Sequence, residues 1–277
     1  MHSRDLIEQY KSYVQDWRRY FHKHPELSNE EFETTKTLAK ELESMGVEVH
    51  VDTERGIGLI GIIHGGKPGK AIALRADIDA LPVHEHNTVD YKSETEGKMH
   101  ACGHDGHMAI LLGAAKMLMS MKDRIEGDVY LAFQPAEETG AGAPDFIKFG
   151  DWYDKVDAIF GGHVWIDLPA GLISVEEGPR MAASSQITIN VKGKQGHGAQ
   201  PHQAIDAIVV ASAIVMNLQT VVSRNVSALD SLVLTIGNIH SGSEWNVIPG
   251  EAKMGGTIRF FDPDQEEYYV ESIRRVV

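Results

Sequence analysis

The chain has 277 residues, a length that suits one large domain or two smaller ones. Hydrophobic residues make up 42% and charged residues 24%, which is typical of a globular protein and excludes a disordered or fibrous chain. The formal net charge is −14, so we expect no nucleic-acid partner and no anionic membrane surface, because both require a basic face.

The first 178 residues have the pattern of an α/β domain. Apolar residues recur at helical spacing through residues 6–47, with an interruption at His24-Pro25-Glu26. Four short apolar runs follow, and a helical pattern over 107–121 lies between the second and the third. The runs are 57–63, 71–76, 129–133 and 156–160. Strands that alternate with helices predict a mostly parallel sheet with helices on both faces.

The pattern changes after Pro179 to that of a smaller α+β domain. Strands are predicted at 186–192, 232–239 and 253–261, and helices at 206–222 and after Pro263. The order strand, helix, strand, strand, helix is that of a ferredoxin-like unit without its last strand. We therefore predict an α/β domain over residues 1–178 and an incomplete ferredoxin-like domain over residues 179–277.

Metal-binding side chains follow the predicted strands of the first domain. One run is followed by Asp77 and Asp79, another by Glu137 and Glu138, and a third by His163; Cys102 and His104 lead into the helical stretch. Ligands of open α/β sheets bind beyond the carboxyl ends of the strands. Thiolate, imidazole and carboxylate are the groups that bind Zn²⁺ and similar divalent ions. The pattern predicts hydrolysis by a metal-activated water, with a neighbouring carboxylate as the base.

Two other classes of protein account for part of the pattern. A cysteine hydrolase would use Cys102 with a histidine, but it needs a thiol of low pKa and leaves Glu137, Glu138 and His163 unexplained. A binding or regulatory protein without activity would keep the fold and lack bound metal. The single cysteine excludes an intrachain disulfide, and residues 1–5 are polar, so we expect a cytoplasmic protein without a secretory signal.

A series of motifs covers nearly the whole chain and resembles a known family. The motifs lie at 19–27, 74–82, 99–107, 133–138, 162–163, 196–202, 245–249 and 256–259. In this order they resemble the dinuclear metallopeptidase family of aminoacylases, hippurate hydrolases, N-acetyl-diaminopimelate deacetylases and plant auxin-amino-acid conjugate hydrolases. The resemblance implies metal-dependent hydrolysis of the amide bond in N-acyl-amino acids or in short peptides with a free carboxylate.

The resemblance also assigns roles to individual residues of the first domain. Glu137 becomes the general base that activates the metal-bridging water. The ligands of two divalent metal ions (Zn, Mn, Co or Ni) become Cys102, His104, Glu138 and His163.

The second domain becomes a lid and dimerisation domain by the same resemblance. His197 is expected to reach the active site of the other subunit of a homodimer and to polarise the scissile carbonyl. Asn246 and Arg259 match lid residues that hold the carboxylate of the substrate.

One part of the family pattern is missing. The last metal ligand of the family is a histidine near the C-terminus, and this sequence has no counterpart of it. We therefore expect the chain to be a fragment or a natural truncation. A protein that ends at Val277 is expected to have little or no hydrolase activity and a weakly bound second metal.

Overall fold

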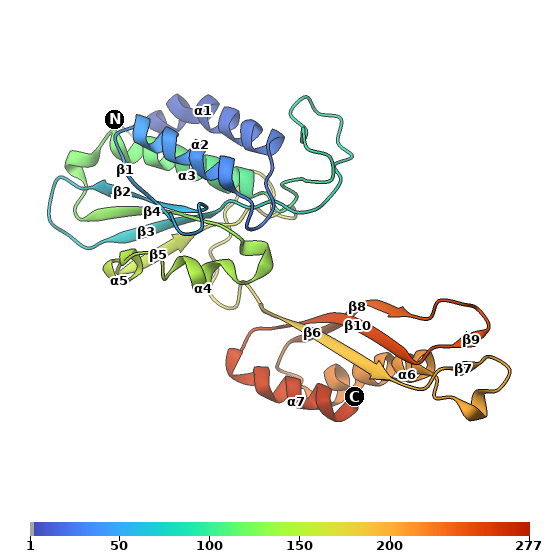
Figure 1. Ribbon diagram of the computed structural model, residues 1–277. Coiled ribbons are helices and arrows are strands. Elements are labelled where there is room, and N and C mark those ends of the chain that lie inside the picture. Colours follow the sequence, from blue (N-terminus) through green and yellow to red (C-terminus); the bar gives the residue numbers. More distant parts are fainter. Residues whose placement is uncertain (1–2) are drawn as a thin grey trace. The chain divides into compact units, whose positions relative to one another are not determined.

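The computed structural model describes residues 3–277 and divides between Ile173 and Ser174 into two compact units. The sequence places this boundary at residue 178. The first unit is a five-stranded sheet with helices on both faces (Figure 1). Its elements are α1 (Ser3–Lys23), α2 (Phe32–Ser44), β1 (Glu48–Val51), β2 (Leu59–His64), β3 (Ile72–Asp77), α3 (His104–Met119), η1 (Lys122–Arg124), β4 (Asp128–Gln134), η2 (Glu137–Thr139), α4 (Gly142–Phe146), α5 (Trp152–Lys155) and β5 (Ala158–Gly161).

The sheet has the order β1-β2-β4-β3-β5 and is mixed. β3 pairs in parallel with β4 and with β5, whereas β2 pairs antiparallel with β1 and with β4. The predicted α/β fold is confirmed, but the sheet is parallel only in one half. The sequence does not predict β1, because the residues of this strand, Glu-Val-His-Val, contain no apolar run.

The central strand β4 is buried on both faces, because successive side chains of a strand point to opposite sides. Val129, Leu131 and Phe133 pack in the core beneath α1, α2 and α3. Tyr130 and Ala132 pack on the other face, in the cluster that contains the aromatic side chains of α4 and α5. This double burial explains why the sequence of β4 reads as a continuous apolar run.

The second unit is a three-stranded antiparallel sheet, in the order β6-β10-β8, that packs against α6 and α7 (Figure 1). Its strands and helices follow the predicted order, with two very short strands added. The elements are β6 (Ala183–Lys192), β7 (Gly196–His197), η3 (Pro201–Gln203), α6 (Ala207–Thr220), η4 (Val221–Asn225), β8 (Leu232–Ser241), β9 (Val247–Ile248), β10 (Glu251–Phe260), η5 (Pro263–Gln265) and α7 (Glu266–Val276).

The helix α6 consists mostly of apolar residues. The segment Ala207–Asn225 has a mean hydropathy of 1.5, so by length and composition alone it would also suit a membrane span. Ala211 and Leu218 on its inner face are nevertheless buried against the sheet. On its outer face, Val209 and Met216 are 62% and 72% exposed. The helix is therefore a core element of the second unit with an apolar surface left over.

Gly58, the residue before β2, lies against the turn that follows β4. Its φ is +77°, and a Cβ atom at this position would lie 2.6 Å from Cδ of Pro135. Gly97 has a similar φ of +75°, but a Cβ atom there would meet nothing within 4 Å. The two glycines therefore share the backbone conformation and differ in their surroundings.

We predict that Gly97→Ala lowers the free energy of unfolding by about 1–2 kcal/mol, the cost of a left-handed conformation in an L residue. Gly58→Ala should lose about 1–3 kcal/mol more, because it also overpacks against Pro135. Urea unfolding followed by tryptophan fluorescence measures both. Equal losses in the two variants would show that the turn around Pro135 gives way without cost.

Candidate metal centre

The carboxyl ends of β3, β4 and β5 lie at one edge of the sheet and carry the polar residues of the sequence motifs. Asp77 ends β3, Glu137 and Glu138 begin η2 after β4, and His163 follows β5. The helix α3 begins at His104 at the same edge. Three groups of side chains there have their ligand atoms within 4.8 Å of one another, and His104 belongs to all three. The groups are Cys102–His104–His163, Asp77–His104–His107 and His104–Glu137–Glu138.

His104 is fully buried and held by Asp79. Its Nδ1 lies 2.9 Å from the carbonyl oxygen of Asp79 and 3.2 Å from a carboxylate oxygen of the same residue. Both neighbours are acceptors, so Nδ1 carries the proton and donates it. The lone pair is then on Nε2, which is the form of histidine that binds a metal ion.

Two buried polar atoms of this site have no hydrogen-bond partner within residues 5–277, namely Nε2 of His104 and Oε1 of Glu138. They lie 3.8 Å apart. Buried polar atoms are nearly always paired, so two orphans that face each other call for a shared ligand. An ion at about 2.1 Å from each atom fits this separation. The residues present therefore fit a divalent metal ion.

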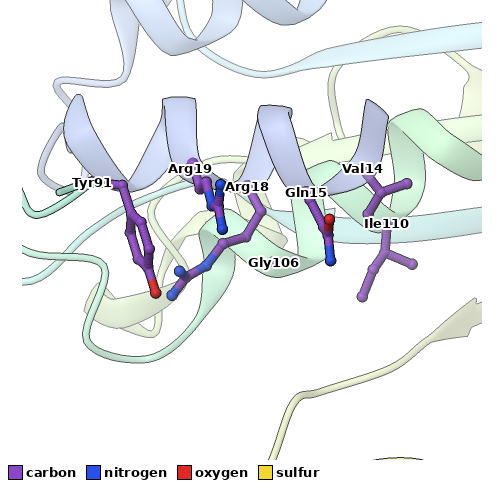
Figure 2. Close-up of a pocket in the computed structure, with 7 residues that line it drawn as sticks. All are labelled: Val14, Gln15, Arg18, Arg19, Tyr91, Gly106 and Ile110. Carbon is purple, nitrogen blue, oxygen red and sulfur yellow. The ribbon is translucent and has the colours of Figure 1, made fainter. Parts of the chain in front are cut away.

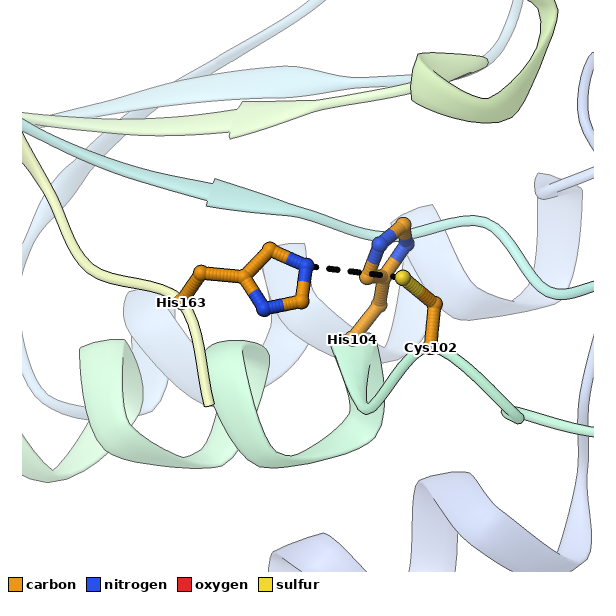
Figure 3. Close-up of side chains that lie close together, drawn as sticks. All are labelled: Cys102, His104 and His163. Carbon is orange, nitrogen blue, oxygen red and sulfur yellow. Dashed lines mark hydrogen bonds between the residues drawn. The ribbon is translucent and has the colours of Figure 1, made fainter. Parts of the chain in front are cut away.

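Cys102 and His163 complete the ring of donors around His104. The Nδ1 of His163 donates to the carbonyl oxygen of Val164 at 2.6 Å, so its Nε2 is left as the acceptor. This Nε2 lies 3.4 Å from Sγ of Cys102, with the ring of His104 beside them (Figure 3). One thiol and two imidazoles thus converge from a loop, a helix start and a strand end.

The pKa values at this edge report an excess of negative charge. Burial, and then the charge of Glu138, raises the pKa of the Cys102 thiol to about 12. The same two causes raise the pKa of Glu137. Burial lowers the pKa of His104, but its hydrogen bond to Asp79 and the charge of Asp77 raise that pKa by more. A bound divalent cation would neutralise this excess.

His107 and Asp77 lie in the centre but use their polar atoms on protein partners. The Nδ1 of His107 donates to Asp77 at 2.5 Å, and its Nε2 accepts the N–H of Val164 at 2.9 Å. The other carboxylate oxygen of Asp77 accepts from Arg75 at 2.7 Å. Burial raises the pKa of Asp77, but His107, His104 and Arg75 lower it by more, so it stays charged. Through these hydrogen bonds, the two residues tie β3, α3 and the segment 163–164 together beside the centre.

The predicted residues of the second unit fall into two places. His197 in β7 pairs opposite Val247, and the N–H of Gly198 donates to the carbonyl of Asn246 at 2.8 Å, so His197 and Asn246 are neighbours. Arg259 lies eight residues along β10 from Glu251, which is about 26 Å at 3.3 Å per residue. The roles expected for His197, Asn246 and Arg259 stay predictions.

A groove between α1 and α3 contains none of the candidate ligands (Figure 2). Arg18 and Arg19 both place a guanidinium 5.1 Å from the ring centre of Tyr91. Arg18 is also ion-paired with Asp105 at 3.0 Å. The side chains with reactive chemistry therefore gather at the sheet edge and not in this groove.

Comparisons with known proteins agree with this centre. The model of peptidase family M20/M25/M40 matches residues 73–269. The chain is 47% identical over 247 residues to the N-acetyl-L-cysteine deacetylase of Bacillus subtilis, covering 89% of this chain and 59% of the deacetylase. It is 43% identical over 286 residues to thermostable carboxypeptidase 2 of Saccharolobus solfataricus, covering 99% and 72%. The Bacillus subtilis YXEP protein, a dinuclear metal binding peptidase, matches with a TM-score of 0.79 and 39% identity over 97% of this chain and 69% of that one.

The α/β fold and the cluster of possible metal ligands agree with these relatives, which are named a deacetylase, a carboxypeptidase and a dinuclear metal binding peptidase. The chain belongs to peptidase family M20/M25/M40. It spans 59% of the length of the deacetylase and 72% of the length of the carboxypeptidase.

We predict that the thiol of Cys102 reacts slowly in the EDTA-treated chain. With a pKa of about 12, only about one thiol in 10⁴ is ionised at pH 8. The rate of labelling by iodoacetamide should therefore lie far below that of glutathione and rise about tenfold per pH unit up to pH 10. The urea-unfolded chain is the control, since Cys102 is its single cysteine. A plateau below pH 9 would identify a low-pKa thiol and favour the cysteine hydrolase instead.

Proposed function

We propose that the protein hydrolyses the amide bond of N-acyl-amino acids, or of short peptides with a free carboxylate, with divalent metal ions. The observation that carries this proposal is the buried, unpartnered Nε2 of His104, which faces the carboxylates of Glu137 and Glu138 at 3.8 Å. The names of a deacetylase and a carboxypeptidase among the relatives support the substrate class. The single cysteine supports a cytoplasmic location.

Four side chains would hold the ions in this proposal: Cys102, His104, Glu138 and His163. Bound divalent ions lower the pKa of water to about 7 and polarise the substrate carbonyl. Glu138 is suited to ligation because its backbone N–H donates to Asp79 at 3.0 Å, which fixes the residue beside His104. The identity of the metal is open among Zn, Mn, Co and Ni.

Glu137 is the proposed general base. Its side chain is 41% exposed, so it can reach a water molecule and a substrate, whereas the side chain of Glu138 is only 22% exposed. Glu137 takes a proton from the attacking water while the water oxygen bonds to the carbonyl carbon. It then returns the proton to the amide nitrogen as the C–N bond breaks, which releases a carboxylic acid and an amine. A raised pKa suits this role, because the group must hold the proton between the two steps.

We predict that Glu137→Gln keeps its bound metal and loses turnover by about 10²–10⁴-fold, the usual contribution of a general base. Hydrolysis of N-acetyl, N-benzoyl and dipeptide substrates is measured with added Mn²⁺, Zn²⁺ or Co²⁺, and metal content by mass spectrometry. Glu126→Gln is the matched control, since Glu126 is exposed and its one ion pair within the side chains of residues 5–277 is with Lys67. A Glu137→Gln variant with more than a tenth of the wild-type turnover would remove Glu137 from this role.

A second candidate is a metal-binding form with little turnover. Four side-chain donors are few for two ions that each take about four ligands, unless water or bridging groups supply the rest. The same assays separate the two candidates. Two ions per chain with measurable turnover support the hydrolase, whereas one weakly held ion without turnover supports the second candidate.

A homodimer through the second unit is part of the proposal. β8 is an edge strand of its sheet, and unpaired edges invite pairing with another copy. The outer face of α6 adds exposed apolar side chains: Ile208, Val209 and Met216. In this dimer the second unit acts as the lid, and His197 serves the active site of the partner subunit.

We predict that a mixture of His197→Ala and Glu137→Gln chains regains activity that neither variant has alone. After subunit exchange, each heterodimer would contain one site in which both residues are intact. Exchange is verified by mass spectrometry of differently tagged chains, and each variant incubated alone is the control. Absence of recovery after verified exchange would place His197 within its own subunit or outside catalysis.

A further inference from the structure

Glu31, at the start of α2, is a buried carboxyl group that the proposed chemistry does not use. It is 0% exposed, and no lysine, arginine or histidine of residues 5–277 forms an ion pair with it. One carboxylate oxygen accepts the backbone N–H of Ala136 at 2.7 Å, while Oε2 is buried without a hydrogen-bond partner in the same part of the chain. Such burial is costly for a carboxyl group, so the hydrogen bond between Glu31 and Ala136 needs an explanation.

Ala136 precedes the two glutamates of the metal centre and has a strained backbone. Its φ is +55° and its ψ is +38°, the left-handed region that residues other than glycine rarely adopt. The conformation turns the chain at the end of β4 so that Glu137 and Glu138 enter η2. The N–H of this buried residue donates to Glu31 and would be unsatisfied without it.

Glu31 also supports the preceding residue, Pro135, through its backbone. Its carbonyl oxygen accepts both the N–H and the hydroxyl of Thr35, at 3.0 and 2.7 Å. The Thr35 hydroxyl oxygen in turn accepts the N–H of Gly58 at 2.9 Å. Gly58 lies directly against the ring of Pro135. The carboxylate of Glu31 thus bonds directly to Ala136. Its carbonyl supports Pro135 indirectly, through Thr35 and Gly58.

The same turn before α2 supports the centre at a second point. The hydroxyl of Ser28 donates to Oδ2 of Asp79 at 2.6 Å, and the N–H of Glu138 donates to the same oxygen at 3.0 Å. The segment 28–31 therefore contacts both the residue that orients His104 and the residue that precedes Glu137.

We propose that Glu31 is a positioning residue of the metal centre: its carboxylate holds Ala136 in the left-handed conformation that presents Glu137 and Glu138 to the site. This inference rests on the proposed function of that site. Loss of the acceptor lets the turn relax and moves the base and one ligand together. Metal affinity and kcat then fall, whereas KM changes little, because Glu31 does not face the substrate.

The test compares two substitutions of similar size. Glu31→Gln keeps an acceptor for Ala136, and Glu31→Met removes it. Glu31→Met should lower the affinity for Co²⁺ and the kcat by about 10–100-fold each, as is usual for residues that orient metal ligands, with KM within about threefold. Glu31→Gln should stay within about threefold of the wild type in all three quantities. Co²⁺ binding is followed by absorbance, so this readout does not depend on turnover.

Thr35→Val is the second variant, for the case that Glu31→Met does not fold. It keeps the volume and removes the oxygen that accepts from Gly58, so Co²⁺ affinity should fall in the same direction. If Glu31→Met binds Co²⁺ with wild-type affinity, the inference is overturned and the proposed function stays intact. The same holds for Thr35→Val where it replaces Glu31→Met in the test. Equal losses in Glu31→Gln and Glu31→Met would also overturn it. A wild-type chain that binds no Co²⁺ would overturn the proposed function and the inference with it.

Discussion

The carboxylate of Asp79 is the interaction on which the metal centre depends. It is 1% exposed and accepts hydrogen bonds from Nδ1 of His104, the hydroxyl of Ser28 and the N–H of Glu138. These donors belong to α3, to the turn before α2 and to the turn after β4, so one side chain ties three segments together. Burial raises the pKa of Asp79, but these hydrogen bonds lower it by more, so the group stays charged. Its charge fixes the proton of His104 on Nδ1 and leaves Nε2 for a metal ion.

The centre concentrates negative charge that the rest of the fold must tolerate. Asp77, Asp79, Glu137 and Glu138 surround His104, and among the side chains of residues 5–277 the one arginine that pairs with any of them is Arg75. Buried carboxylates of this kind are stable only when paired or hydrogen-bonded, or when they bind a cation. The strained Ala136 and the unpartnered atoms of His104 and Glu138 are further costs. Strain and unsatisfied groups of this sort gather at functional sites, where the surrounding structure holds them in place.

Much of this arrangement could be predicted because it follows from local pattern. Apolar runs located β2, β3, β4 and β5, and the polar residues just beyond them located the centre. What could not be predicted depends on contacts between distant segments. Glu30 and Glu31 look like a solvated acidic pair at a helix start, and only the fold buries Glu31 against Ala136, 105 residues away.

The most direct test of this account is anomalous diffraction from crystals of the protein loaded with Zn²⁺. The account predicts a metal ion bound to His104 through Nε2 and to Glu138, with Asp79 outside the coordination sphere and still hydrogen-bonded to Nδ1. An ion bound to Nδ1 of His104, or to the carboxylate of Asp79, would contradict it, because Asp79 would then be a ligand and not the residue that orients one.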